Sequence, residues 1–86
     1  MSSKVTMYAA DWCGDCRRSK RLLDQLQVKY DLIDVEADES AAAKVIEING
    51  GFRAIPVIVF EDGTHLTEPS DRALRQKLLE LSLIES

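Results

Sequence analysis

Residues 4–27 read KVTMYAADWCGDCRRSKRLLDQLQ, and this stretch contains both cysteines of the chain. Residues 4–9 alternate between polar and apolar side chains and include β-favouring types, which predicts a strand. From residue 14 to about residue 27 the alternation stops and helix-forming residues take over, with three leucines on one stripe. The pair Cys13 and Cys16, in C-x-x-C spacing, therefore lies where a strand passes into a helix.

This position at the start of a helix bears on the chemistry of the two thiols. A thiol there faces unpaired backbone N–H groups and the positive end of the helix dipole, and both favour the nucleophilic thiolate. Cys13 is at the expected N-cap and is expected to be the more exposed of the two, so it is the predicted attacking thiolate. Cys16, one turn further on, is the predicted resolving thiol. Gly14 has no side chain, which lets the backbone of a partner approach Cys13 closely.

The remaining segments alternate between strand and helix patterns. We predict a strand at 30–35, a helix at 41–48 that follows the acidic cap residues Asp38 and Glu39 and is closed by Asn49-Gly50-Gly51, and a buried apolar strand at 56–60. An Asp-Gly turn at 61–64 leads to a short strand at 65–67. Ser70 is the expected N-cap of a last helix, in which leucines keep helical spacing.

The order β-α-β-α-β-β-α defines an α/β fold. Two strands joined by one helix require a parallel, right-handed crossover, and a hairpin makes the last two strands antiparallel. We therefore expect a single domain over residues 1–86 with the thioredoxin-like fold in its small, glutaredoxin-type form. That form is a four-stranded mixed sheet flanked by three helices.

Length and composition narrow the classes of function. The 86 residues suffice for one domain, and 11 basic against 15 acidic residues give a net charge of −4, which argues against nucleic-acid binding. Residues 1–4 lead into a strand pattern without the apolar segment of a signal peptide, and the longest apolar run, 55–60, is too short to cross a membrane. We expect a cytoplasmic protein with neither a nucleic-acid nor a membrane partner. Structural disulfides are rare in that reducing compartment, so the cysteine pair indicates catalysis or metal binding.

Redox catalysis is the function that the cysteine pair favours. A C-x-x-C beside a βαβ pattern is typical of thiol–disulfide exchange. Two cysteines do not complete a tetrahedral metal site, and His65 is alone and distant in the sequence, so we predict no metal site within one chain. A metal bridged between two chains and a purely structural cysteine pair stay open as alternatives.

Ile55-Pro56 opens the third predicted strand. Proline donates no hydrogen bond to a ladder, so it belongs at a strand start, and the bond that precedes it can be cis. A cis-proline opposite Cys13 would present the backbone of Ile55 to an extended substrate. An ordinary trans proline is the alternative.

Three segments resemble the glutaredoxin superfamily, over residues 5–81. They are Trp12-Cys13-Gly14-Asp15-Cys16, Asn49-Gly50-Gly51-Phe52-Arg53-Ala54-Ile55-Pro56, and Asp62-Gly63-Thr64 followed by Thr67-Glu68-Pro69-Ser70. Within that superfamily the pattern is most similar to the mycoredoxins, which reduce mixed disulfides between proteins and mycothiol, the low-molecular-weight thiol that actinobacteria use in place of glutathione. The resemblance implies an enzyme, a thiol–disulfide oxidoreductase, that holds no bound cofactor and uses mycothiol or glutathione as co-substrate.

The resemblance also implies roles for single residues. Ser70 and Asp71 align with the pair that holds a glutathione carboxylate at a helix N-terminus. Arg53 is placed to donate a charge-assisted hydrogen bond to the thiol or to a protein partner, and Trp12 is expected chiefly as a packing lid. Cys13 and Cys16 are the implied catalytic residues, and the implied substrate-binding residues are Trp12, Gly14, Asp15, Arg53, Ile55, Pro56, Ser70 and Asp71.

The chain departs from glutathione-using glutaredoxins at three places. Asp11 replaces the Lys or Arg that typically stands two residues before the first cysteine, Gly14-Asp15 replaces Pro-Tyr, and Thr67-Glu68 replaces Gly-Gly. The added negative charge suits a less anionic thiol such as mycothiol. The expected partners are protein mixed disulfides, the low-molecular-weight thiol and its reductase.

Two other functions stay open. One is a dithiol electron donor reduced by thioredoxin reductase, as in the redoxins that feed ribonucleotide reductase, which also resemble this chain. The other is a homodimer that binds an iron–sulfur cluster through Cys13 and two external thiols.

Overall fold

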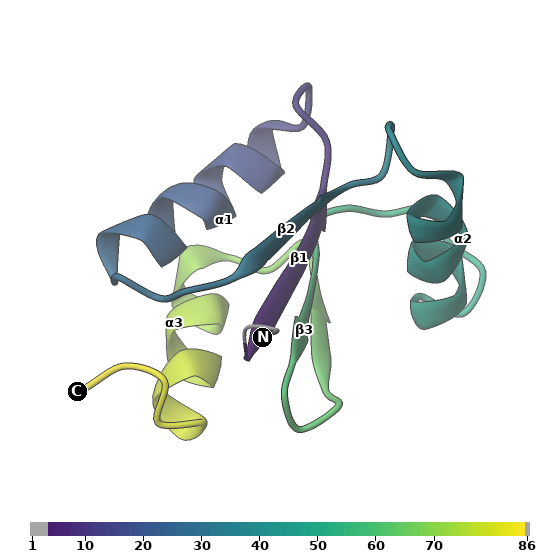
Figure 1. The fold of residues 1–86 in the computed structure, drawn as a ribbon. Coiled ribbons are helices and arrows are strands. Elements are labelled where there is room, and N and C mark those ends of the chain that lie inside the picture. The colour runs from purple at the N-terminus through teal and green to yellow at the C-terminus, as the bar shows by residue number, and fades with distance from the viewer. Residues whose placement is uncertain (1–3, 86) are drawn as a thin grey trace.

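The computed structural model describes residues 4–85, and its elements follow the predicted order. Figure 1 shows these elements: β1 (Val5–Ala9), α1 (Gly14–Gln25), β2 (Asp31–Asp34), α2 (Glu39–Ile48), β3 (Val57–Phe60), β4 (His65–Thr67) and α3 (Asp71–Glu80). Two predicted boundaries were wrong by two residues, because α1 ends at Gln25 and α2 already begins at Glu39.

The four strands form one mixed sheet in the order β2-β1-β3-β4. β1 and β2 are parallel, with Thr6 opposite Asp31, as a single-helix crossover requires. β3 runs antiparallel to both β1 and β4. The thioredoxin-like fold predicted from the order of elements is confirmed.

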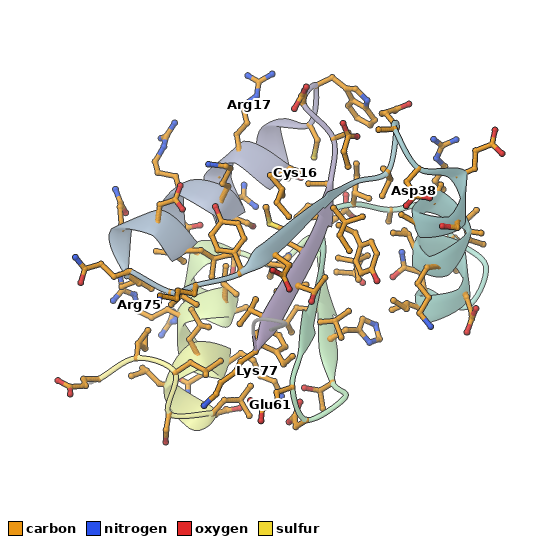
Figure 2. The ribbon with its side chains drawn as sticks, in the orientation of Figure 1. Cys16, Arg17, Asp38, Glu61, Arg75 and Lys77 are labelled. Carbon is orange, nitrogen blue, oxygen red and sulfur yellow. The ribbon has the colours of Figure 1, made fainter. Side chains whose placement is uncertain are left out.

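Helices cover both faces of this sheet. α1 and α3 lie on one face and α2 lies on the other (Figure 1). The larger core lies under α1 and α3 and includes both cysteines, whereas the smaller core, with Val45 and Val57, lies under α2. Figure 2 shows the Cys16 side chain on the sheet side of α1, while Arg17 points away from the sheet. The cysteine pair is therefore anchored in the larger core.

The three helices begin and end in similar ways. Cys13, Asp38 and Ser70 are the N-caps, and the side chain of each accepts a backbone N–H of the following turn. After each C-cap comes a residue with positive φ: Gln27 at 57°, Gly50 at 70° and Ser82 at 57°. A left-handed residue at this position ends a helix, which is why α1 stops before Gln27. Within residues 4–85 no helix is long and apolar enough to span a membrane.

Candidate active site

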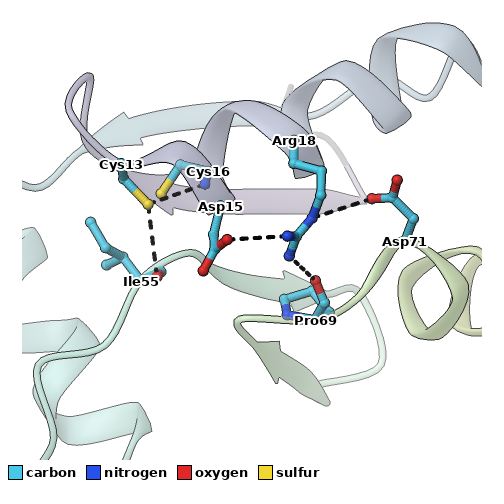
Figure 3. A network of polar contacts seen from close by, with 7 residues as sticks. All are labelled: Cys13, Asp15, Cys16, Arg18, Ile55, Pro69 and Asp71. Carbon is cyan, nitrogen blue, oxygen red and sulfur yellow. Dashed lines mark hydrogen bonds and ion pairs between the residues drawn. The ribbon is translucent and has the colours of Figure 1, made fainter.

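Cys13 lies where the backbone of α1 and the loop before β3 meet. The backbone N–H of Cys16 donates a hydrogen bond to Cys13 Sγ over 3.1 Å (Figure 3). This bond satisfies one of the unpaired N–H groups of the first turn, and an N–H donor is the kind of group that stabilises a sulfur anion. The same sulfur lies 3.9 Å from the carbonyl oxygen of Ile55. The site thus supplies Cys13 with a donor from one side and a carbonyl from the other.

Cys16 is more deeply enclosed, although the difference in exposure is small. Cys13 is 6% exposed and Cys16 is 3% exposed, and both are free thiols. Burial, followed by the hydrogen bond with Cys13, raises the pKa of the Cys16 thiol from 9.0 to about 12. Cys16 therefore carries its proton at neutral pH and has to lose it before it can attack a disulfide.

The Ile55–Pro56 peptide bond is cis and lies directly before β3. The buried Pro56 is tied to the end of β4, because its carbonyl accepts the backbone N–H of Glu68 over 2.9 Å. The cis form that the sequence allowed at this bond is present, and the Ile55 carbonyl faces Cys13 Sγ. The space above Gly14 is open, since a Cβ added there would meet no atom within 4 Å.

Arg18 joins the N-terminal ends of α1 and α3 (Figure 3). Its guanidinium donates to Asp15 Oδ1 and to the Pro69 carbonyl, each over 3.1 Å, and its Nε lies 3.6 Å from Asp71 Oδ1. Asp15 and Asp71, which were both predicted to contact substrate, are thus brought together and partly neutralised by one cation. Arg18 was not among the predicted site residues. Its carbonyl partner is 51 positions away, so no local pattern signals the contact.

Trp12 and Arg53 lie on the other side of Ile55, around a hollow of about 320 Å³. The lining residues are Trp12, Val35, Glu36, Ala42, Val45, Arg53 and Ile55. The indole of Trp12 is 65% exposed, and its Nε1 donates to Glu36 Oε1 over 2.7 Å. Trp12, expected as a packing lid beside the active loop, lines this hollow and is largely exposed, and Glu36 holds its polar edge.

Asn49 fastens the loop that carries Arg53 and Ile55. Its Nδ2 donates to the carbonyls of Phe52 and Ala54, over 3.1 and 3.0 Å, while its Oδ1 accepts the hydroxyl of Thr67 over 2.6 Å. The sequence indicated Asn49 as a helix terminator and as the first residue of a segment that resembles the glutaredoxin superfamily, but predicted no contact for its side chain. Its tie to β4 spans 18 positions and leaves no signal in a helix or strand pattern.

Metal binding at this site would need ligands from outside the chain. Among residues 4–85 no three side chains of His, Cys, Asp or Glu gather closely enough to hold a metal ion. Cys13 and Cys16 supply two of the four ligands of a tetrahedral site.

Comparison with known proteins shows that the family model described as Glutaredoxin matches residues 5–66 of this chain, a range that includes both cysteines. The chain belongs to the glutaredoxin family. This glutaredoxin is 48% identical over 67 residues to mycoredoxin 1 of Corynebacterium glutamicum, across 78% of this chain and 82% of the relative. It is 36% identical over 58 residues to the glutaredoxin-like protein NrdH of Lactococcus lactis, across 67% of this chain and 78% of the relative.

Solved structures of glutaredoxins share the fold. The glutaredoxin of Archaeoglobus fulgidus gives a TM-score of 0.74 at 25% identity, covering 86% of this chain and 84% of its own. A buckwheat glutaredoxin in complex with glutathione gives 0.71 at 26% identity, covering 96% and 83%. Glutaredoxins are thiol–disulfide oxidoreductases, and this chain is an enzyme of that class.

Proposed function

We propose that this glutaredoxin reduces mixed disulfides between proteins and a low-molecular-weight thiol, with Cys13 as the nucleophile and Cys16 as the resolving thiol. The observation that carries the proposal is the setting of the Cys13 sulfur. It accepts the Cys16 N–H over 3.1 Å at the N-terminus of α1, and in its thiol form it donates to the Ile55 carbonyl over 3.9 Å. A thiolate held at a helix start beside an open approach suits attack on a disulfide sulfur.

In the proposed first step the Cys13 thiolate attacks the small-thiol sulfur of the mixed disulfide. A bond forms between Cys13 and that sulfur, the original S–S bond breaks, and the protein leaves as a thiolate that takes up a proton. A second small-thiol molecule then attacks as its thiolate, releases the small disulfide and returns Cys13 to its starting form. Each cycle consumes one free small-thiol molecule, whose sulfur is oxidised as the protein sulfur is reduced, and the reductase converts the small disulfide back into two thiols.

Cys16 offers a second way to release the small thiol. Attack of Cys16 on the Cys13 sulfur would expel the small thiolate and leave a Cys13–Cys16 disulfide. Burial, the largest cause of the raised Cys16 pKa, persists when Cys13 is in a mixed disulfide, so the attacking form of Cys16 is scarce at neutral pH and this branch is slower. The raised value therefore supports a monothiol route, in which Cys16 is dispensable.

We propose mycothiol as the co-substrate in preference to glutathione. Acidic side chains, namely Asp11, Asp15, Glu68 and Asp71, accompany the site, and Arg18 already pairs with two of them. Such charge disfavours a tripeptide with two carboxylates more than a thiol with fewer charges. The 48% identity to mycoredoxin 1 of C. glutamicum also supports this choice. The similarity to NrdH of L. lactis supports the alternative of a donor reduced by thioredoxin reductase.

We further propose that residues 1–86 act as a single domain in the cytoplasm, on protein mixed disulfides and without a nucleic-acid or membrane partner. Two free thiols that must stay reduced suit a reducing compartment. The net charge of −4 supports the absence of a nucleic-acid partner.

The test is turnover of a mycothiolated protein by wild type, Cys13→Ser and Cys16→Ser, followed through NADPH consumption. Each protein is supplied in turn with mycothiol and its reductase, glutathione and its reductase, or thioredoxin reductase alone. We expect turnover with the mycothiol pair in wild type and Cys16→Ser and none in Cys13→Ser, because only Cys13 is required in the monothiol route.

Other outcomes would replace the proposal in defined ways. Equal inactivity of both variants with every mixed disulfide contradicts the monothiol route, and turnover with thioredoxin reductase alone establishes the dithiol donor. A coloured dimer with visible absorbance after anaerobic purification would establish the iron–sulfur protein instead.

A further inference from the structure

We propose that Asn49 is a positioning residue for this site: its side-chain amide holds the loop 50–54 against the end of β4 and thereby sets Ile55 opposite Cys13. The inference rests on the proposed function, because Ile55 matters only if Cys13 reacts with a substrate that lies along its backbone. Asn49 itself is the C-cap of α2 and touches none of the reacting atoms.

The hydrogen bonds of Asn49 use both ends of its amide. The NH₂ group donates to two carbonyls of the same loop, those of Phe52 and Ala54, and the amide oxygen accepts the hydroxyl of Thr67. An amide is the side chain that provides two donors and an acceptor on one planar group. A carboxylate of the same shape would face two carbonyl oxygens with no proton to donate. The site therefore requires Asn rather than Asp.

Among the residues that the structure describes, the loop has few other anchors apart from the hydrogen bonds of the Gly50 and Gly51 N–H groups to the last turn of α2. Residues 50–54 belong to no helix or strand, and Gly50 and Gly51 both have positive φ, which glycine reaches at low cost. The Phe52 side chain is 72% exposed and gives the loop no core anchor. The Asn49 amide therefore gives the loop two hydrogen bonds, whereas the side chains of the loop make few packing contacts.

We call the hydrogen bonds of the Asn49 amide to Phe52, Ala54 and Thr67 the clamp. The β4 end of this clamp lies next to Pro56. Thr67 is followed by Glu68, whose backbone N–H donates to the Pro56 carbonyl over 2.9 Å. The segment before Pro56 is thus tied to β4 through Asn49, and the segment after it through Glu68. Loss of the Asn49 amide releases the first tie, while the second tie and the packing of the Ile55 side chain against both cores remain, so residues 52–54 become mobile and the Ile55 backbone is held less closely opposite Cys13.

The experiment compares Asn49→Ala, Asn49→Asp, Thr67→Val and Thr67→Ser, with Thr64→Val as the matched control. Thr64 donates an equally short 2.6 Å hydrogen bond, to Asp62, in the turn that joins β3 to β4 and away from Cys13. Three quantities are measured well below each midpoint of thermal unfolding: kcat/KM for a mycothiolated protein, the rate of Cys13 alkylation by iodoacetamide, and amide hydrogen exchange at Gly50 and Gly51, the loop residues whose N–H groups are bonded, to the Glu47 and Ile46 carbonyls.

We expect kcat/KM to fall about tenfold in both Asn49 variants, mainly through KM, because small misplacements of a binding group are costly. The fall should be about threefold in Thr67→Val, which loses one hydrogen bond, and less than about twofold in Thr67→Ser and Thr64→Val. Alkylation of Cys13 by the small reagent should stay within about twofold in every variant, since it needs no substrate-binding loop. Exchange at Gly50 and Gly51 should accelerate in the two Asn49 variants and in Thr67→Val, and in none of the other variants.

A lowered unfolding midpoint with unchanged kcat/KM and unchanged exchange would overturn the proposal and leave Asn49 a purely structural residue. The proposal would also be overturned if Thr67→Ser lost as much activity as Thr67→Val, because the loss would then not come from the missing hydroxyl. If wild type fails to reduce every mixed disulfide, the proposed function has failed. Hydrogen exchange still decides whether the clamp exists, so the two failures are distinguishable.

Discussion

Cys13 and Cys16 differ most in what their sulfur atoms contact. Cys13 Sγ receives a helix N–H and faces a loop carbonyl, whereas Cys16 is enclosed in the larger core and keeps its proton. The exposed fractions of the two residues are close, so exposure alone would not assign their roles. The unequal hydrogen bonding supports the proposal that Cys13 is the nucleophile of the pair.

The raised pKa of Cys16 predicts a loss of stability at alkaline pH. Its folded value of about 12 exceeds the ordinary 9.0, so between these values the native state binds more protons than the unfolded state. The contribution is complete below about pH 9 and falls as pH rises toward 12. By about pH 10.5 the loss should be on the order of 2 kcal/mol.

Urea unfolding of reduced wild type and Cys16→Ala between pH 8 and pH 10.5, followed by circular dichroism, checks this prediction. Other alkaline groups such as Tyr30 are common to both proteins, so the difference between the two pH profiles isolates Cys16. Parallel profiles would show that the Cys16 thiol ionises at the same pH in the folded and unfolded chains.

The sequence predicted those site residues whose role is local. Cys13 and Ser70 were expected as N-caps and are N-caps, because a cap depends on the next three residues. Arg18 and Asn49 were not recognised as site residues, because their partners are in other elements. Propensity and periodicity carry no information about which distant carbonyl a guanidinium or an amide will meet.

At the scale of elements, one hydrogen-bond pattern ends all three helices. The N–H groups of the two residues that follow each C-cap turn back onto the last turn: Gln27 onto Asp24 and Val28 onto Leu23 in α1, Gly50 onto Glu47 and Gly51 onto Ile46 in α2, and Ser82 onto Leu79 and Leu83 onto Leu78 in α3. This is the Schellman motif, which places its first such residue in the left-handed region. Only α2 has glycine there.

Glycine at the two other helix ends should stabilise the protein. A side chain at positive φ costs about 1–2 kcal/mol, and glycine loses about 0.5–1 kcal/mol of extra backbone entropy on folding. Gln27→Gly and Ser82→Gly should therefore each raise the free energy of unfolding by about 0.5–1 kcal/mol, measured from urea midpoints.

Gly50→Ala is the matched control at the third helix end. A Cβ at Gly50 would meet no atom within 4 Å, so its effect comes from the backbone alone. The free energy of unfolding should fall by about the same 0.5–1 kcal/mol. An unchanged midpoint in all three variants would contradict the left-handed geometry at these ends.

The boundaries of the helices show where element prediction fails. Asp38 and Ser40 are both cap-type residues, and the structure uses Asp38, whose Oδ1 accepts the N–H groups of Ser40 and Ala41. α2 therefore starts at Glu39 instead of residue 41. In α1 the apolar stripe continues to Leu26, which packs against the core although it is the C-cap, so periodicity overshoots the end of the helix.

On the scale of the whole molecule, the two cores share one sheet. β3 gives Ile58 to the core under α1 and α3 and Val57 to the core under α2. The radius of gyration is 12.1 Å, close to the roughly 12 Å expected for a compact domain of this length. Because neither core exists without the sheet, both should be lost together.

We therefore predict a single unfolding transition in which the calorimetric and van't Hoff enthalpies agree. Leu23→Ala, in the larger core, should lower the free energy of unfolding by about 2–5 kcal/mol, and Val45→Ala, in the smaller core, should lower the same midpoint by less. Differential scanning calorimetry of the three proteins checks this. Separate transitions, one for each core, would contradict the proposal of a single domain.

The topology was predictable from connections, and the arrangement of the site was not. A helix between two strands requires parallel pairing, and a tight Asp-Gly turn requires antiparallel pairing, so both followed from the sequence. The position of β3 beside β1 sets Ile55 next to Cys13. That juxtaposition depends on strand order, which a pattern of single elements does not contain.

The exposed setting of Trp12 has an optical consequence. Trp12 is the single tryptophan of the chain, and its indole is already 65% exposed in the folded state. The wavelength of its maximum fluorescence emission should therefore change little when the protein unfolds, so tryptophan fluorescence is a weak monitor of unfolding. A molecule that enters the hollow between Trp12 and Arg53 would remove water from the ring and shift the emission to the blue. The chain thus carries an intrinsic, label-free reporter of occupancy at its own site.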